Sequence, residues 1–295
     1  MAQSFAQTEI STQPDAWRQA AGLAASLSDV LPRPDRRVAV VGCGTSWFMA
    51  QSYAALRETG GSGRTDAFAA SEMPRGREYD HVVAITRSGT TTEVLRLLDS
   101  LRGTAPITVL TANPAGVSEV ADEIVDLSFA DEHSVVQTRF ATSALAVLRA
   151  HLGGDLGGAI ADAERVLAEP LPADLLDAEQ FAFLGTGWTV GLAHEAALKF
   201  REAAIFWTES YPALEYRHGP VSIAEPGRVT WMFGPAPHGL ADEVARTGAA
   251  FREHRGDPMA DLVRAQRLAV ELGHRRGLDP DQPRHLTRSV LLDHA

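Results

Sequence analysis

Residues 40–56, VVGCGTSWFMAQSYAAL, decide the fold, because the chain repeats their pattern at residues 183–199, FLGTGWTVGLAHEAALK. The two stretches align without gaps, with Gly42 matching Gly185 and Gly44 matching Gly187. Each stretch has the form of an apolar strand, a glycine-containing turn and a helix. A pattern that recurs once at this separation predicts two related domains rather than a solenoid of short repeats.

Working outward, short apolar strands alternate with helices through the first half of the chain. Strands are expected at 36–44, 64–72, 80–88, 105–113 and 122–128, and helices at 46–60, 90–103 and 134–154. Strands rich in Val, Ile and Ala between helices indicate a parallel sheet covered on both faces. We therefore predict an α/β fold of two tandem doubly wound, flavodoxin-like parallel-sheet domains, residues 1–170 and 171–295.

The second domain is expected to be shortened. Its third strand, 227–237, is followed by Pro and Gly instead of a turn rich in hydroxyls. No clear further strand separates residues 249–257 from the helix predicted at 258–277.

Composition excludes several functional classes. The chain has 295 residues, 45% of them hydrophobic, with a net charge of −11, whereas a nucleic-acid-binding domain is expected to carry a basic face. No apolar run approaches the roughly 20 residues that span a bilayer, and the first residues lack the pattern of a secretory signal. The single cysteine, Cys43, excludes an intramolecular disulfide and fits a reducing compartment, so a cytoplasmic protein is expected.

Two turns combine glycine with hydroxyl side chains at a predicted helix start. Residues 84–98, AITRSGTTTEVLRLL, pass from strand to helix through Ser88, Gly89 and three threonines, and residues 42–46 read GCGTS. Helix N-termini and hydroxyls together bind anions, and both turns fall at the carboxyl ends of strands, where doubly wound sheets bind ligands. The alternative is that the hydroxyls simply cap two helices. Neither turn matches a dinucleotide or triphosphate motif.

Charged residues form a stripe on the helix of the second repeat. Glu195, Lys199 and Glu202 are spaced i, i+4 and i+7, so they share one face. An exposed ladder of ion pairs is one reading. The other is a partly desolvated cleft, in which a carboxylate beside an ammonium serves as a proton carrier. His218, which precedes a Gly-Pro turn, is either a surface residue or part of the same site.

Together these motifs resemble the sugar isomerase (SIS) family, in particular the isomerase half of glucosamine-6-phosphate synthase. The resemblance covers nearly the whole chain. It runs in order through EISTQPDAW, GCGTS, TRSGTT, EHSVVQTRF, EAALKFRE, ALEYRHGP and DQPRHLTRSV.

The resemblance implies a sugar-phosphate site with defined members. The phosphate and sugar hydroxyls would be held by Gly44, Thr45, Ser46, Thr86, Arg87, Ser88 and Thr91, with Val135 and Gln137. Glu202 would move a proton between C1 and C2, supported by Glu195 and by Lys199, which would help to stabilise oxyanion charge. His218 would open the sugar ring and reach into a partner subunit's site, which implies a homodimer.

Three departures from the synthase matter. No stretch of the chain corresponds to its glutaminase domain, and Cys43 lies inside a turn, so no glutaminase activity is expected. Arg87 and Arg139 stand where the synthase has Gln and Lys. Arg288 stands where the synthase has the lysine that forms an imine with the keto-sugar, and a guanidinium cannot form one.

The sequence therefore predicts an aldose–ketose isomerase or deaminase for a hexose or hexosamine 6-phosphate, with no metal, organic cofactor, nucleic acid or membrane as partner. A fructosamine-6-phosphate deglycase is a close variant. A non-catalytic sugar-phosphate sensor is the alternative from another class, although it gives no reason for the Glu195–Lys199–Glu202 stripe.

Overall fold

The computed structural model describes residues 3–292; the outermost residues of the two predicted domains, 1–2 and 293–295, lie outside that description. The first sheet has five parallel strands in the order β2-β1-β3-β4-β5. This is the flavodoxin-like order, which places a ligand crevice at the carboxyl ends of β1 and β3. The strands are β1 (Val38–Gly42), β2 (Thr65–Ala69), β3 (His81–Thr86), β4 (Ile107–Thr111) and β5 (Glu123–Asp126).

The second sheet has four parallel strands in the order β7-β6-β8-β9, which repeats the first four positions of the first sheet. The strands are β6 (Gln180–Gly185), β7 (Thr208–Pro212), β8 (Arg228–Phe233) and β9 (Ala250–Glu253). The predicted α/β class with two parallel sheets is therefore confirmed. The sequence had given no separate strand for β9, which is only four residues long.

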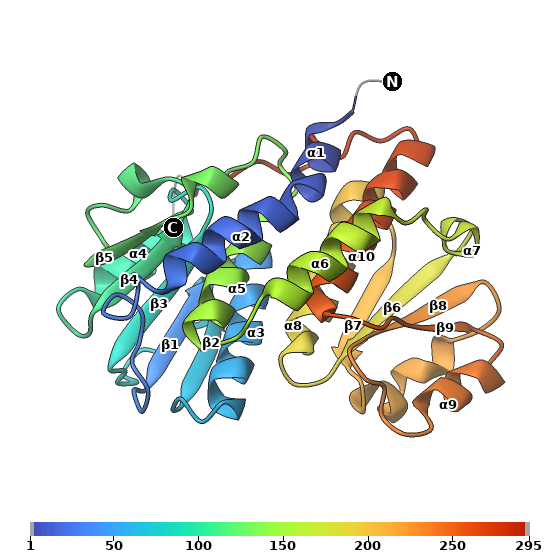
Figure 1. Cartoon of the computed structure of the whole chain (residues 1–295), viewed down its shortest axis with the longest axis horizontal. Coiled ribbons are helices and arrows are strands. Elements are labelled where there is room, and N and C mark those ends of the chain that lie inside the picture. Colours follow the sequence, from blue (N-terminus) through green and yellow to red (C-terminus); the bar gives the residue numbers. More distant parts are fainter. Residues whose placement is uncertain (1–2, 293–295) are drawn as a thin grey trace.

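The two sheets stand at opposite ends of the molecule, and helices lie between them (Figure 1). They are α2 (Gln13–Ala24), α3 (Thr45–Thr59), α5 (Arg139–His151), α6 (Gly157–Ala168), α8 (Thr189–Ala204) and α10 (Pro258–Arg275). The other helices are α1 (Phe5–Ser11), α4 (Thr92–Leu101), α7 (Ala173–Leu176) and α9 (Leu240–Arg246). Short 3-10 turns are η1 (Ala70–Glu72), η2 (Pro114–Gly116), η3 (Ser128–Ala130), η4 (Glu215–His218) and η5 (Pro220–Ile223).

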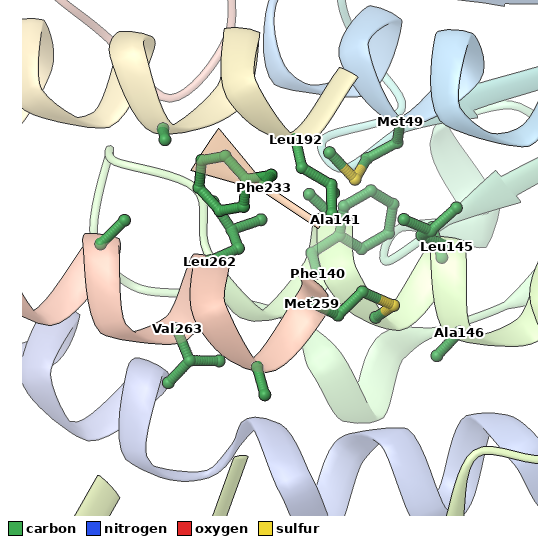
Figure 2. Packing of buried hydrophobic residues seen from close by; sticks show 14 of the residues in the cluster. Met49, Phe140, Ala141, Leu145, Ala146, Leu192, Phe233, Met259, Leu262 and Val263 are labelled. Carbon is green, nitrogen blue, oxygen red and sulfur yellow. The ribbon is translucent and has the colours of Figure 1, made fainter. Parts of the chain in front are cut away.

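One hydrophobic core joins the inner faces of both sheets. Figure 2 shows Phe140 of α5 lying among Met49 of α3, Leu192 of α8 and Met259 of α10. All four side chains are fully buried. Burial of such side chains contributes roughly 1.5–3 kcal/mol each, so this core fixes how the two halves meet.

Helices α3 and α8, which follow the two repeated strands, approach each other unusually closely. A Cβ added at Gly191 of α8 would lie 2.3 Å from the carbonyl oxygen of Phe48 and 2.3 Å from Ser52 Oγ. Only glycine fits this position. The close packing brings the start of α3 beside the middle of α8, where the charged stripe lies.

The segment after α10, residues 276–292, is the C-terminal tail, which crosses from the second half to the first (Figure 1). The carboxylate of Asp281 accepts hydrogen bonds from the backbone N–H groups of Phe5 and Ala6 at 2.8 and 2.7 Å. The carbonyl of Asp281 accepts from the N–H of Val135 at 3.0 Å. The tail is thereby fixed to the first half before it reaches the turn after β3.

The helix predicted at 134–154 begins later than expected, at Arg139. The buried carboxylate of Glu132 explains the difference, because its Oε1 accepts from the N–H groups of Thr138 and Arg139 at 2.6 and 2.7 Å. A carboxylate at this end satisfies free N–H groups and favours the helix dipole. Within residues 3–292, no helix is both long and apolar enough to cross a bilayer.

Candidate functional site

The turn between β3 and α4 lies at the carboxyl edge of the first sheet, and its shape depends on a glycine. Gly89 has a φ of +64°, and a Cβ there would lie 2.8 Å from the carbonyl oxygen of Asn113. The side-chain amide of Asn113 donates to the carbonyl of Ser88 at 2.8 Å. Thr91 is the N-cap residue of α4 but makes no side-chain capping bond. The hydroxyl of Thr91 therefore does not cap α4.

Three hydroxyls of the turn, those of Ser88, Thr90 and Thr91, form what we call the hydroxyl cradle. Ser88 and Thr90 donate to the hydroxyl of Ser289 in the tail at 3.2 and 3.0 Å, and Thr91 Oγ1 lies 3.5 Å from the same oxygen. An anion bound at the start of α4 would face these hydroxyls together with the positive end of the helix dipole.

Arg87 is buried and binds backbone carbonyls. Its guanidinium donates to the carbonyl of Ser134 at 3.0 Å and to those of Val135 and Arg288 at 3.2 Å. The carboxylate of Glu132 lies 3.7 Å away. Burial lowers the pKa of Arg87, and the charge of Glu132 opposes that shift, so the guanidinium stays charged. Arg87 thus joins the turn, the segment before α5 and the tail.

Arg288, which stands at the position of the imine-forming lysine in the resemblance, has partners outside the charged stripe. Its guanidinium donates to the carbonyl of Glu132 and pairs with the carboxylate of Asp131. Among the described residues, no ion pair joins Arg288 to Glu195 or Glu202. The structure therefore places its side chain on the segment before α5.

The second turn, GCGTS, begins α3 and meets α8 through one hydrogen bond. Gly44 is the N-cap residue with a φ of +53°, and Thr45 and Ser46 follow as buried residues. Lys199 Nζ donates to Thr45 Oγ1 at 3.1 Å. A turn of the first half and a helix of the second half thus share one polar cluster.

Lys199 lies between the two carboxylates of its stripe. Its Nζ is 2.5 Å from Glu202 Oε2 and 3.4 Å from Glu195 Oε1. The side chains of Lys199 and Glu195 are 1% and 0% exposed, whereas that of Glu202 is 19% exposed. The exposed-ladder reading is therefore wrong, because surface pairs leave both partners in water.

Burial and the neighbouring charges shift the pKa values of Glu195 and Lys199. Burial raises the pKa of Glu195 to about 7. The positive charge of Lys199 opposes this rise, and the negative charge of Glu202 adds to it. Neither carboxylate oxygen of Glu195 accepts a hydrogen bond from residues 3–292. For Lys199, burial alone would lower the pKa, but the negative charges of the two carboxylates raise it by more. The net shift is therefore upward, and the side chain remains an ammonium.

Glu202 is the member of the stripe that faces open space. It lines a cavity of about 30 Å³ with Ile205 and residues of the tail, Leu278 and Gln282 among them. Helix α8 ends at Ala204, and its C-cap residue, Ile205, has a φ of +51°, a left-handed conformation rare for a β-branched residue. Strain of this kind gathers at functional sites.

The remaining predicted residues lie in three places. Thr86 is buried at the end of β3. Val135 is held between Arg87 and the tail, and the side-chain oxygen of Gln137 is buried with no hydrogen-bond partner within residues 3–292. His218 is exposed at the end of η4. Its side chain makes no hydrogen bond in the described part of the chain, so the structure does not join it to Glu202.

Sequence reasoning left three contributors out of the site: Thr90, Glu132 and Ser289. Thr90 belongs to the quoted turn, and Ser289 follows Arg288 in the LTRSV motif, so both had a signal nearby. Glu132 had none beyond the EHSVVQTRF motif.

Other features offer weaker candidates. Burial raises the pKa of the Cys43 thiol, and the charge of Glu93 adds to the shift, so Cys43 stays protonated. A cavity of about 690 Å³ is lined by Arg37 and Val82 at the opposite, amino-terminal ends of β1 and β3. No three His, Cys, Asp or Glu side chains among residues 3–292 converge so as to hold a metal ion.

No family model matches the chain, but its sequence is similar to those of curated proteins that share one name. The isomerizing glutamine–fructose-6-phosphate aminotransferase of Gloeobacter violaceus is 28% identical over 320 residues, which cover 87% of this chain and 52% of that protein. The enzyme of the same name from a strain of Thermus thermophilus is 28% identical over 323 residues, 89% of this chain and 53% of that protein. The chain therefore spans about half the length of these curated relatives.

Solved structures match over the whole fold. Glucosamine-6-phosphate deaminase from Thermotoga maritima superposes with a TM-score of 0.83 at 25% identity, covering 98% of this chain and 100% of that one. Tagatose-6-phosphate ketose/aldose isomerase from Escherichia coli gives a TM-score of 0.81 at 18% identity, covering 99% and 97%, which shows a shared fold. The chain is thus a homologue of the isomerase half of the aminotransferases and shares its fold with solved sugar-phosphate isomerase and deaminase structures.

Proposed function

We propose that this protein is an enzyme that acts on a hexose or hexosamine 6-phosphate, either as an aldose–ketose isomerase or as an amino-sugar-phosphate deaminase. The observation that carries the proposal is the carboxylate of Glu202, held 2.5 Å from a buried ammonium and beside a small cavity. The ammonium in turn is bonded to Thr45 in a turn of the predicted phosphate site.

In the proposed reaction, Glu202 removes the proton from the carbon beside the sugar carbonyl. The electron pair moves to the carbonyl oxygen and gives an enediol-type intermediate. Glu202 then returns the proton to the former carbonyl carbon, while the hydroxyl proton of the other oxygen passes to the negatively charged oxygen, so that the carbonyl stands on the neighbouring carbon and aldose and ketose are exchanged. The hydrogen bond from Lys199 orients the Glu202 carboxylate, and the positive charge of Lys199 offsets negative charge that develops on the sugar oxygen.

The phosphate group would bind at the start of α4, on the hydroxyls of Ser88 and Thr91. Thr45, Ser46 and Thr86 would contact the sugar. Arg87 and Arg288 are proposed to act from behind this site, because their guanidinium groups already bind backbone carbonyls and Asp131. A substrate with a nitrogen substituent, as in deglycation of a fructosamine 6-phosphate, would use the same groups.

The assembly is proposed to be a homodimer in which His218 opens the sugar ring in the partner subunit's site. The exposure of His218, and its lack of a hydrogen bond from residues 3–292, leave its ring available for such a contact. We further propose the division into domains 1–170 and 171–295, with the second a shortened copy of the first. Helix α6 ends at Ala168, just before this proposed boundary.

The proposal is tested by turnover of a panel of sugar phosphates. Glucose, fructose, glucosamine and tagatose 6-phosphates are incubated with the protein, and products are followed by NMR. At least one should be converted, and the matched unphosphorylated sugars should not. Tight binding of a sugar phosphate with no turnover of any would favour the sensor over the enzyme.

A further inference from the structure

We infer that Glu9 is a positioning residue for the sugar. From the N-terminal helix α1, its carboxylate holds residues 133–137, which we call the sugar segment, in the shape that binds the substrate. The inference rests on the proposed function, because Val135 and Gln137 of this segment are predicted contacts of the sugar phosphate. It gives a role to the EISTQPDAW motif, which no step of the proposed reaction uses.

Glu9 meets the sugar segment through three short contacts. Its Oε1 accepts hydrogen bonds from the backbone N–H groups of His133 and Ser134 at 2.5 and 3.2 Å. Its Oε2 lies 2.6 Å from the hydroxyl oxygen of Ser134, which also lies 2.7 Å from the carbonyl oxygen of Val136. Glu9 is only 3% exposed. Hydrogen bonds to a carboxylate are about twice as strong as bonds between neutral groups, so Glu9 is a strong anchor for the start of the segment.

The sugar segment needs such an anchor because it has no regular structure of its own. In the described structure, residues 132–138 form neither a helix nor a strand, so no ladder of backbone hydrogen bonds fixes them. A buried backbone N–H group without a partner is costly. Glu9 supplies the partner for the N–H of Ser134, which is a buried residue.

A second charged side chain holds the same segment from the turn after β3. Arg87 donates to the carbonyls of Ser134 and Val135 at 3.0 and 3.2 Å. Glu9 thus binds donors of the segment, and Arg87 binds its acceptors. Because Arg87 directly precedes Ser88, the sugar segment lies beside the proposed phosphate site.

One side chain of the sugar segment offers an acceptor to a ligand. The side-chain oxygen of Gln137 is buried and accepts no hydrogen bond from residues 3–292. A buried polar group normally has a partner, and a sugar hydroxyl is a suitable donor. Gln137 follows Ser134 by three residues in an irregular segment. The place of its side chain therefore depends on where Glu9 holds the start of the segment, and small displacements of a positioning group are costly.

Helix α1 gives Glu9 a fixed base. Ala6 and Ile10 of α1 are buried in the core that joins the two halves. The start of α1 is fixed as well, since the carboxylate of Asp281 accepts from the N–H groups of Phe5 and Ala6. A carboxylate on such a base can impose its position on the sugar segment instead of following it.

Trp17 of the same motif provides a matched control. Its indole N–H donates to the hydroxyl of Thr142 in α5 at 3.0 Å. Trp17 is fully buried, so Trp17→Phe, like Glu9→Ala, removes a buried hydrogen bond between the N-terminal helices and the rest of the first half. That bond lies in α5 and not in the sugar segment. An effect that the two variants share is therefore a loss of stability alone.

The test measures, by titration calorimetry on the full chain, the affinities for inorganic phosphate and for the sugar phosphates of the panel. Glu9→Ala should bind a sugar phosphate roughly fivefold to thirtyfold more weakly than the parent, because the sugar segment loses its anchor. Its affinity for inorganic phosphate should stay within about twofold of the parent's, since phosphate alone does not need the segment. Glu9→Gln keeps an oxygen for the two N–H groups and should regain most of the affinity. Trp17→Phe should bind both ligands as the parent does.

Two further measurements address the same contact. With a sugar phosphate that the parent converts, Glu9→Ala should raise KM by the factor seen in calorimetry and leave kcat within about threefold of the parent's. Ser134→Ala removes one contact of Glu9 from the side of the segment and should weaken sugar-phosphate binding by roughly twofold to fivefold. Should Glu9→Ala not fold, unchanged affinity of Ser134→Ala overturns the inference.

The other outcomes separate the inference from the proposed function. Equal sugar-phosphate affinity of Glu9→Ala and Trp17→Phe, or a Glu9→Gln variant as weak as Glu9→Ala, overturns the inference and leaves the proposed function standing. Equal weakening of inorganic phosphate by Glu9→Ala does the same, since it would mean general damage to the site. If the parent binds sugar phosphates but converts none, the proposed enzyme is overturned, and the affinities still decide the role of Glu9. If the parent binds none of them, both are overturned.

Discussion

Lys199 of α8 and Thr45 of α3 are joined by a 3.1 Å hydrogen bond that links the two halves of the molecule at the proposed site. The first half supplies the hydroxyls and the helix starts, and the second supplies the ionisable stripe. Because α3 and α8 meet at Gly191 with no room for a Cβ, the position of Lys199 depends on the packing between the halves. The geometry of the proposed site therefore depends on how the two halves pack against each other.

Thr45→Val should destabilise the fold, since it keeps the shape but removes an acceptor from a buried ammonium. We expect a loss of about 1–3 kcal/mol in the free energy of unfolding, the cost of leaving a buried polar group unpaired. Urea denaturation measures this loss. Thr104→Val, at an exposed hydroxyl, is the control and should change little. Equal stability of the two variants would mean that the Thr45 bond does not hold Lys199.

Ser88→Ala should weaken binding of a phosphorylated sugar by roughly 1–2 kcal/mol, because one charge-assisted hydrogen bond is lost. Binding of the same sugar without phosphate should be weak and unaffected. Calorimetry with glucose 6-phosphate and glucose separates the two. Equal affinity of the parent protein for both sugars would argue against a phosphate site in this turn.

Glu195 should make stability depend on pH. Its pKa is about 7 in the folded protein against 4.5 for the ordinary group, so between these values the folded protein keeps a proton that the unfolded chain releases. The stabilisation by that proton is complete below the lower value and is lost as the pH rises through the upper one.

Over this window the free energy of unfolding should fall with pH more steeply in the parent than in Glu195→Gln, by up to about 1.4 kcal/mol per pH unit. Urea denaturation at about pH 5, 6 and 7.5 measures the two slopes. Parallel slopes would show that Glu195 titrates near its ordinary pKa in the folded protein.

No imine should form with a keto-sugar. Lys199 is the only lysine in the chain, and its raised pKa keeps it an unreactive ammonium. Arginine at position 288 cannot form an imine either. Borohydride added with fructose 6-phosphate should therefore trap no adduct visible by mass spectrometry. An adduct on Lys199 would contradict this reading of the stripe.

Much of the architecture could be predicted from sequence because it follows local periodicity. The repeat at 40–56 and 183–199 predicts the strand–turn–helix units that the structure shows as β1–α3 and β6–α8. The i, i+4, i+7 spacing places Glu195, Lys199 and Glu202 on one face, and that face is where the two halves meet.

The rest depends on contacts between distant parts of the chain. Ser88 and Ser289 are 201 positions apart, and no local pattern indicates that the second hydroxyl lies in the turn of the first. The late start of α5 depends on Glu132, which lies six positions before Thr138 and caps the helix from outside it. Arg87 follows a strand like a phosphate ligand, yet its partners are carbonyls of residues 134, 135 and 288.

The most direct measurement is solvent deuterium exchange into a sugar phosphate, followed by proton NMR in heavy water with the parent and with Glu202→Gln. Proton transfer by Glu202 predicts that the parent incorporates deuterium at C1 or C2 of its substrate. Glu202→Gln should do so at least about 100-fold more slowly, with binding largely kept. Glu215→Gln, an exposed carboxylate on η4, should match the parent. Exchange at the parent rate in Glu202→Gln, or no exchange by the parent with any sugar phosphate of the panel, would contradict the account.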